Sequence, residues 1–235
     1  MITPPPAARH IAALLAAASV TAALTACSHT TQHTPPGSPS AAPSSSSAPA
    51  GADISRVDNV KNDFPPGFTV EVHPARTLNR HDLGSSDIDP FAGTTVDPPH
   101  CGPAIIPPNT TLSIGTQVAA VSGHADRGII EVDALRLPKP IAPVPPPAGC
   151  DTVTLSGSPE VSGTAERVPA PTIDGVTTTA IKTTGAGQED PEYLFTAALN
   201  DHTTVMVTGN TDAALNPQHV MSDLLVKAVL AVRGR

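Results

Sequence analysis

The sequence contains few aromatic and few basic residues. Only 2% of its 235 residues are aromatic, with no Trp and a single Tyr. It therefore lacks the flat stacking surfaces that sugar-binding and single-strand-binding sites use. Lys and Arg number 13 against 21 acidic residues, for a net charge of −8. This total indicates no basic footprint for nucleic acid or anionic lipid headgroups, and we expect no nucleic-acid partner.

Motifs of known reactions are also missing. The chain after residue 27 contains no G-x-S-x-G, H-E-x-x-H, Walker A, G-x-G-x-x-G or S-x-x-K pattern. Asp87 and Asp89, with their neighbouring serines, could bind a hard cation, and His124 with Asp126 could supply a base and its orienting acid. Turn-forming acids and a solvated hairpin tip explain both groups better. We therefore predict a protein that is not an enzyme and has no catalytic, cofactor-binding or metal-binding residues.

The first 26 residues have the pattern of an export signal. Arg9 precedes an uncharged run over residues 11–24, which has the length of a signal-peptide core and is short for a membrane span. The run ends in Leu-Thr-Ala followed by Cys27, which resembles the lipobox of bacterial lipoproteins. This resemblance implies diacylglycerol on the Cys27 sulfur, cleavage before Cys27 and acylation of its amine. The alternative is an ordinary cleavage site with Cys27 as a free thiol or bridge partner.

A lipid-modified Cys27 predicts a protein on the outer side of the cell membrane, anchored and not spanning. Two or three acyl chains, at about 0.8 kcal/mol per buried CH₂, hold a protein at a bilayer far longer than one chain does. Residues 28–52 contain Ser, Pro, Ala and Thr but no charged residue, and such a segment buries too little apolar area to fold. We interpret residues 27–52 as the lipidated Cys followed by a disordered tether with a reach of roughly 25–30 Å.

Residues 53–235 predict one extracytoplasmic α+β domain, with a mostly antiparallel sheet of five to seven strands and a C-terminal helix packed on one face. Pro217 and a helical repeat of apolar residues begin that helix, with Asn216 as its expected N-cap. The remaining segments are predicted as a short helix over 54–64, a strand over 68–72, loops or broken helices over 74–110, a hairpin of 117–121 with 129–137, a proline-rich sheet edge over 138–147, and strands over 152–155, 161–168, 176–183, 193–199 and 203–208.

Two of the three cysteines remain once Cys27 is assigned to the lipid. In an oxidising export compartment, Cys101 and Cys150 are expected to form a disulfide. The loop between them has about 50 residues, for which the chain-entropy model gives roughly 4 kcal/mol of stabilisation. The alternative is a redox-active or thiolate site that uses the neighbouring His100. No C-x-x-C motif or zinc-ligand spacing supports that alternative.

Several segments together resemble a known group of proteins. They are the lipobox signal, the Ser/Pro tether, VKNDFPPGF at residues 60–68, DPFAG at 89–93, and PHC at 99–101. This combination is similar to a family of uncharacterised mycobacterial envelope lipoproteins, and distantly to the extracellular sensor domain of the PknH-type receptor kinase. The resemblance implies an α+β domain with a ligand- or partner-binding role. Sensor domains of that type carry two disulfides and this chain has cysteines for one, so no binding residue is carried over.

Three functional classes fit these patterns. A non-catalytic, sensor-like module for a small-molecule, lipid or protein ligand fits best, because export, tether and disulfide occur without a reaction motif. A lipid or small-molecule carrier is the alternative and would need a large apolar cavity. An envelope hydrolase is third, and a Ser or His next to an acid in one cleft would favour it.

Overall fold

A computed structural model describes residues 51–84, 93–144, 146–157, 162–185 and 190–235. These residues form a nine-stranded sheet in the order β1-β3-β4-β9-β8-β7-β6-β5-β2, with every neighbouring pair antiparallel. The strands are β1 (Thr69–Thr77), β2 (Thr95–Asp97), β3 (Gln117–Ala125), β4 (Gly128–Arg136), β5 (Thr152–Ser156), β6 (Gly163–Arg167), β7 (Thr177–Gly185), β8 (Glu192–Ala198) and β9 (Thr203–Thr211). The predicted antiparallel α+β class is confirmed, with more strands than expected.

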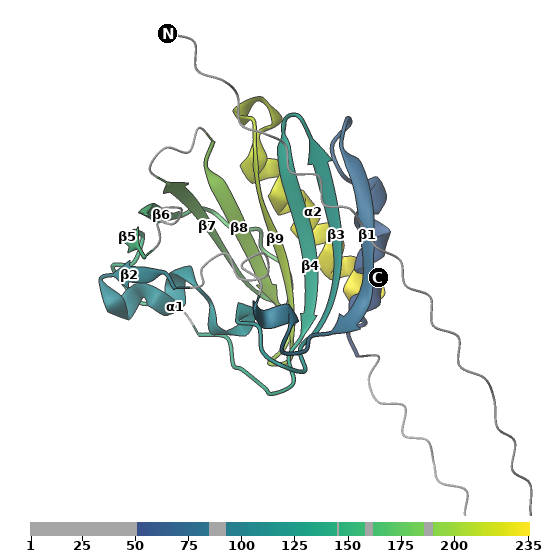
Figure 1. Cartoon of the computed structure of the whole chain (residues 1–235), viewed down its shortest axis with the longest axis horizontal. Coiled ribbons are helices and arrows are strands. Elements are labelled where there is room, and N and C mark those ends of the chain that lie inside the picture. Colours follow the sequence, from purple (N-terminus) through teal and green to yellow (C-terminus); the bar gives the residue numbers. More distant parts are fainter. Residues whose placement is uncertain (1–50, 85–92, 145, 158–161, 186–189) are drawn as a thin grey trace, which may run out of the picture. The chain divides into compact units, whose positions relative to one another are not determined.

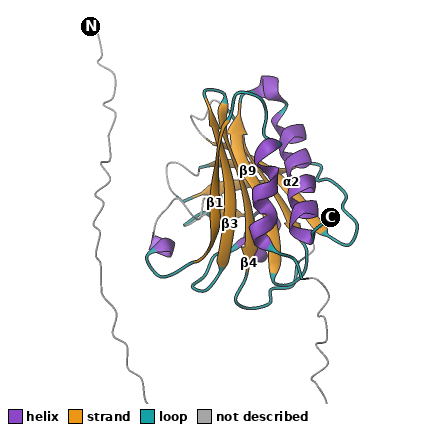
Figure 2. Ribbon diagram, turned by 90° about the vertical axis from the view of Figure 1, so that its right-hand side faces the viewer, coloured by secondary structure: helices purple, strands orange, loops and turns teal. Residues whose placement is uncertain are grey.

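The longest helix covers one face of this sheet. It is α2 (Pro217–Arg233), whose apolar stripe is buried against β4, β8 and β9. A 3₁₀ helix, η1 (Ile54–Asn62), packs beside it. Figure 2 shows both helical segments on the same side of the strands. Short helices make up the rest, namely η2 (Asp82–Gly84), η3 (Pro99–Cys101), α1 (Gly102–Ile105), η4 (Pro108–Thr110) and η6 (Ala213–Leu215).

Two apolar clusters lie on opposite faces of the sheet. The larger cluster joins α2 and η1 to inward-facing residues of the central strands, including Phe195, Val205 and Val207. The smaller cluster surrounds the disulfide and contacts Leu194 of β8 from the other side. Both faces of β8, and of β9 around Met206, pack against apolar residues, as the apolar residues on both faces of 193–208 predict. These two strands are the fifth and fourth in the sheet order.

Four local predictions were wrong in detail. The 117–137 hairpin turns only at Asp126 and Arg127, because both strands continue through residues expected in the turn. The strand expected over 68–72 continues to Thr77, and β2 lies within the segment expected to be loops or broken helices. The proline-rich segment is not a sheet edge, since β1 and β2 occupy the two edges.

The start of α2 differs from expectation in its capping. Asn216 precedes the helix at the predicted position but lies in the left-handed region, with φ 52°, and its side chain makes no capping hydrogen bond. Pro217 occupies the first turn as predicted. Among the helices in the described part of the chain, none is long and apolar enough to cross a membrane. The predicted signal peptide, Cys27 and all of the tether except residues 51 and 52 lie outside the described residues.

Candidate functional site

The sheet face opposite α2 carries two acidic residues in its centre. Successive side chains of a strand point to opposite faces. On β4, Ile130 and Val132 belong to the cluster under α2, so Glu131 and Asp133 project from the other face. Figure 1 looks onto this face, with α2 behind β3, β4 and β9. The carboxylates therefore lie where no long helix covers the strands.

Neighbouring strands place small and polar side chains around these acids. In the register, Ser122 and Thr208 flank Glu131, and Ala120 and Met206 flank Asp133. β1 adds His73, which pairs with Ala120 in the register. We call the set Glu131, Asp133, Ser122, Thr208 and His73 the carboxylate face. Ala120 provides only a methyl group between the positions of His73 and Asp133.

Burial determines the electrostatics of this face. Desolvation raises the pKa of the Asp133 carboxyl well above its ordinary value of 3.8, and the nearby Glu131 charge raises it further. Desolvation also raises the pKa of Glu131, while His73 and His124 act in the opposite direction. Neither carboxylate forms a hydrogen bond or ion pair with a residue in the described part of the chain. Two partly buried carboxylates without protein partners favour a positively charged or hydrogen-bond-donating ligand.

A serine and a histidine also meet on the carboxylate face. His73 Nε2 lies 2.9 Å from Ser122 Oγ, and Ser122 is 7% exposed. The two residues come from adjacent strands, β1 and β3. A serine nucleophile activated by a histidine base requires this hydrogen-bond distance. A hydrogen bond that only joins the two strands has the same geometry, so the distance alone does not distinguish the two roles. On the other side of Ser122, Glu131 of β4 is its partner in the register between β3 and β4.

A third acid, Glu192, lies on the same sheet face, towards the end of the sheet that carries the turn between β3 and β4. Glu192 of β8 pairs with Asn210 of β9, which in turn pairs with Ile129 of β4. Desolvation raises the pKa of Glu192. Asn210 is exposed and Ile129 is 48% exposed. A third desolvated acid therefore lies on the same sheet face, at the end where Asn210 and Ile129 are exposed.

The candidate residues named from the sequence do not form this site. His124 and Asp126 are both exposed, and no hydrogen bond or ion pair between them occurs within the described ranges. His124 is in β3, not in the turn. It contributes only through its effect on the pKa of Glu131. Asp87 and Asp89 lie outside the described residues.

The predicted disulfide between Cys101 and Cys150 is present. The sulfur atoms are 1.99 Å apart, and both residues are fully buried. His100 Nε2 lies 3.6 Å from Cys101 Sγ, and the three residues are close enough to bind a metal if the sulfurs were free. Because the sulfurs are bonded to each other, they are not metal ligands here. The bridge holds α1 over the sheet beside the carboxylate face.

Two surface hollows occur elsewhere in the described structure. One of about 480 Å³ is lined mainly by prolines and threonines together with Val96 and Ile106. The other, of about 440 Å³, lies at the start of α2 beside His219 and Ser222. His219 already contacts Asp223, at 3.3 Å. Neither hollow includes a member of the carboxylate face.

Sequence reasoning missed Glu131, Asp133, Ser122 and His73 as a group. The available signal was the alternation in IIEVDAL at residues 129–135, which puts two acids on one strand face. That alternation normally indicates a solvated face, and only the neighbouring strands show that these acids are desolvated.

Comparison with known proteins identifies the class to which this fold belongs. Residues 53–233 match a family described as a domain of unknown function, DUF5642, and the chain belongs to this family.

Among solved structures, the chain is similar to an uncharacterised protein, an Rv0999 ortholog, from Mycobacterium smegmatis. The TM-score is 0.60, with 22% identity, and the match covers 79% of this chain and 100% of that chain. Identity at this level shows a shared fold only. No match was found among curated proteins.

Proposed function

We propose that this protein is a cell-envelope lipoprotein whose folded domain binds a ligand without catalysing a reaction. The resemblance of Cys27 and its preceding residues to a lipobox supports the anchor. A protein from Mycobacterium smegmatis has a similar fold, which agrees with the resemblance of this chain to mycobacterial envelope lipoproteins. The distant similarity to a receptor-kinase sensor domain supports a ligand-binding role outside the membrane.

The observation that carries the binding role is the desolvated, unpartnered carboxylate of Asp133 on a face without a long helix. Burying a charge without a partner is costly, and a bound cation or amine removes this cost. With Glu131 beside it, the site carries up to two negative charges. We propose a ligand that presents a positive charge or several hydrogen-bond donors to these carboxylates.

Thermal shift measurements with defined probes test the binding role. Ca²⁺, spermidine and L-arginine represent a metal ion, a polyamine and a guanidinium compound. We expect at least one to raise the Tm at pH 7.5, and a concentration of 100 times Kd corresponds to about 2.7 kcal/mol of stabilisation. The paired substitution Glu131→Gln with Asp133→Asn should abolish the shift. Asp126→Asn, on the exposed turn, is the matched control and should retain it. An identical shift in both variants would contradict the proposed site.

The anchor is tested separately by labelling with a palmitate analogue in a mycobacterial host. The native protein should lose residues 1–26, incorporate the label and partition into the detergent phase. Cys27→Ala should incorporate no label, whereas Ser28→Ala should behave as the native protein. A native chain that keeps residues 1–26, or remains unlabelled, would refute the anchor.

A hydrolase is a second candidate because His73 and Ser122 are within hydrogen-bond distance on the same face as two acids. An activated serine reacts with fluorophosphonate probes, and Ser122→Ala would remove the labelled peptide. We expect no labelling of the native protein, because Ser122 is almost fully buried.

The carrier alternative is tested by mass spectrometry of lipids extracted from the purified protein.

A further inference from the structure

One end of the sheet receives the chain from the proposed tether. The Asp53 backbone N–H donates to the carbonyl of Val232, 2.9 Å away near the end of α2. The Arg136 guanidinium donates to the carbonyl of Ala52. Arg136 ends β4 and pairs with Gln117 at the start of β3. We call this end of the domain, where residue 53 and the end of α2 meet the sheet, the tether end.

Basic residues are concentrated at the tether end. Of the twelve Lys and Arg residues that follow residue 27, seven lie there, in the η1 start, the end of β1 and its following loop, the end of β4 and its following loop, and the end of α2. They are Arg56, Arg76, Arg80, Arg136, Lys139, Arg233 and Arg235. Within the described residues, the acidic side chains that accompany them are Asp53, Asp82, Asp174 and Asp201, with Asp58 two residues after Arg56 on η1. Counted over the described residues, this end has a surplus of positive charge, although the whole chain is strongly acidic.

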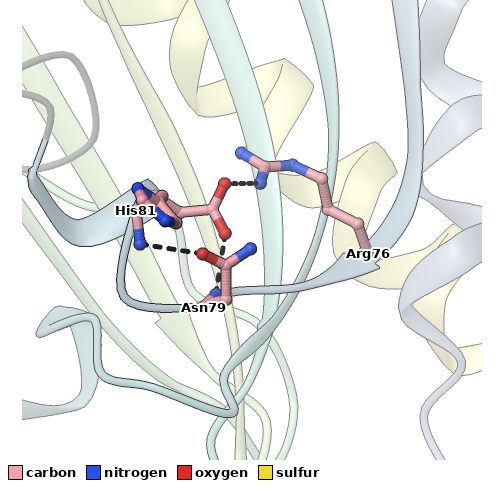
Figure 3. A network of polar contacts seen from close by, with 4 residues as sticks. Arg76, Asn79 and His81 are labelled. Atoms are coloured by element: carbon pink, nitrogen blue, oxygen red, sulfur yellow. Dashed lines mark hydrogen bonds and ion pairs between the residues drawn. The ribbon is translucent and has the colours of Figure 1, made fainter.

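The loop after β1 shows how these charges are held. Asp82 accepts hydrogen bonds from the Arg76 guanidinium at 2.6 Å and from the Asn79 backbone N–H at 2.7 Å. Asn79 Oδ1 accepts from the backbone N–H of His81 at 2.8 Å. Figure 3 shows this network. These bonds fix the loop that carries Arg80, which is exposed and has no ion pair within the described ranges, so its charge is available to a partner.

An exposed aliphatic side chain accompanies the charges. Ile114 is 55% exposed, the largest value among the exposed large apolar residues of the described chain. The next residue, Gly115, donates its backbone N–H to the carbonyl of Leu78 at 2.9 Å, which places Ile114 beside the β1 loop at the tether end. Basic residues surrounding an exposed aliphatic residue are typical of surfaces that contact lipid headgroups.

We propose that the tether end docks onto a bilayer surface bearing anionic phospholipids. This inference rests on the proposed lipid anchor, because an anchor at Cys27 keeps residue 53, and with it this end of the domain, within the reach of the tether from the membrane. The positive surplus complements anionic headgroups, whereas the acidic remainder of the domain is repelled by them. The net charge of −8 gave no indication of this basic surface, because a total does not show that the basic residues are concentrated at one end of the domain.

Vesicle co-sedimentation tests the docking without the anchor. All described elements lie after residue 50, so the chain from residue 27 onward with Cys27→Ala is used. Vesicles of phosphatidylcholine that contain about 30% phosphatidylglycerol, an anionic lipid, are compared with vesicles of phosphatidylcholine alone. We expect binding only to the anionic vesicles and its loss in about 0.5 M NaCl, because salt screens exposed charges.

Charge reversal locates the docking surface. Each basic residue near an anionic membrane contributes about a fivefold factor in partitioning, so Arg80→Glu with Lys139→Glu should weaken binding by at least about 25-fold. Lys61→Glu with Lys182→Glu makes the same change in net charge away from the tether end and should have a small effect. Equal loss in both variants, equal binding to neutral vesicles, or no binding to anionic vesicles would overturn the docking surface. Failure of the anchor is detected independently, by the labelling of Cys27.

Discussion

Asp133 is the residue whose chemistry depends most on its surroundings. Its carboxyl is desolvated on the carboxylate face, and the nearby Glu131 charge acts in the same direction. Because its folded-state pKa is raised above 3.8, the native protein binds the proton more tightly than the unfolded chain does. Stability therefore falls as the pH rises from about 4 through the raised pKa.

Replacing Asp133 by Asn should remove this pH dependence. We expect Asp133→Asn to raise the Tm at pH 7.5, and each 1 kcal/mol regained corresponds to about 2–4 °C in a domain of this size. The difference from the native protein should shrink towards zero below about pH 4, where both forms are neutral at this position. Thermal unfolding between pH 4 and 8 measures it, with Asp126→Asn as the exposed control. A difference that does not change with pH would contradict desolvation as the cause.

Gly123 is required by close packing rather than by its backbone angles. A Cβ atom at this position would clash with Phe64 Cδ1 and would lie 3.1 Å from Phe68 Cδ1. We expect Gly123→Ala to lower the free energy of unfolding by about 1–3 kcal/mol, as overpacking does elsewhere. Gly102→Ala is the matched control, because no atom lies within 4 Å of its added Cβ. Denaturant titration distinguishes the two, and equal stabilities would show that the aromatic rings move aside without cost.

At the level of elements, the disulfide and the short helices around it form the second apolar cluster. Val96 of β2 and Ile105 of α1 pack there against Leu194 of β8. β2 has only three residues and lies at the sheet edge. So short an edge strand has few hydrogen bonds of its own, and the bridge supplies the restraint that pairing does not.

Removal of the bridge should therefore loosen this part first. For Cys101→Ala with Cys150→Ala we expect a loss of roughly 4 kcal/mol, from the 49-residue separation. Limited proteolysis should cleave the variant near α1 before it cleaves the central strands. Cys27→Ala, which leaves the bridge intact, is the control for loss of a cysteine. Unchanged protease resistance near α1 would show that apolar packing alone holds the segment.

For the whole molecule, the sheet order predicts a gradient of local stability. β9 and β8 lie at the centre, and β8 packs against an apolar cluster on each face, whereas β1 and β2 are edge strands. We expect the slowest amide hydrogen exchange in β9, β8 and β4, and the fastest among the strands in β1 and β2. Exchange followed by mass spectrometry measures this order. Protection of β1 equal to that of β9 would contradict it.

Several elements could be predicted because their signals are local. Apolar spacing and Pro217 indicated α2, and two strand-like runs on either side of a polar turn indicated the hairpin of β3 with β4. Apolar residues on both faces indicated the central position of β8 and β9. The capping of α2 was less accessible, since the left-handed conformation of Asn216 depends on the turn before it. β2 was missed because three residues give too short a pattern, and its pairing with β5 joins distant parts of the chain.

The amino-acid sequence alone determined the α+β class, the cysteine pair and the lipobox-like segment, because each depends on residues at short or fixed spacing. Tertiary structure decided two other features. Pairing of β1, β3, β4 and β9 desolvated Glu131 and Asp133 and brought His73 to Ser122. The meeting of separate chain segments gathered the basic residues at the tether end. Desolvation and charge density depend on neighbours in space, and neighbours in space are set by strand order.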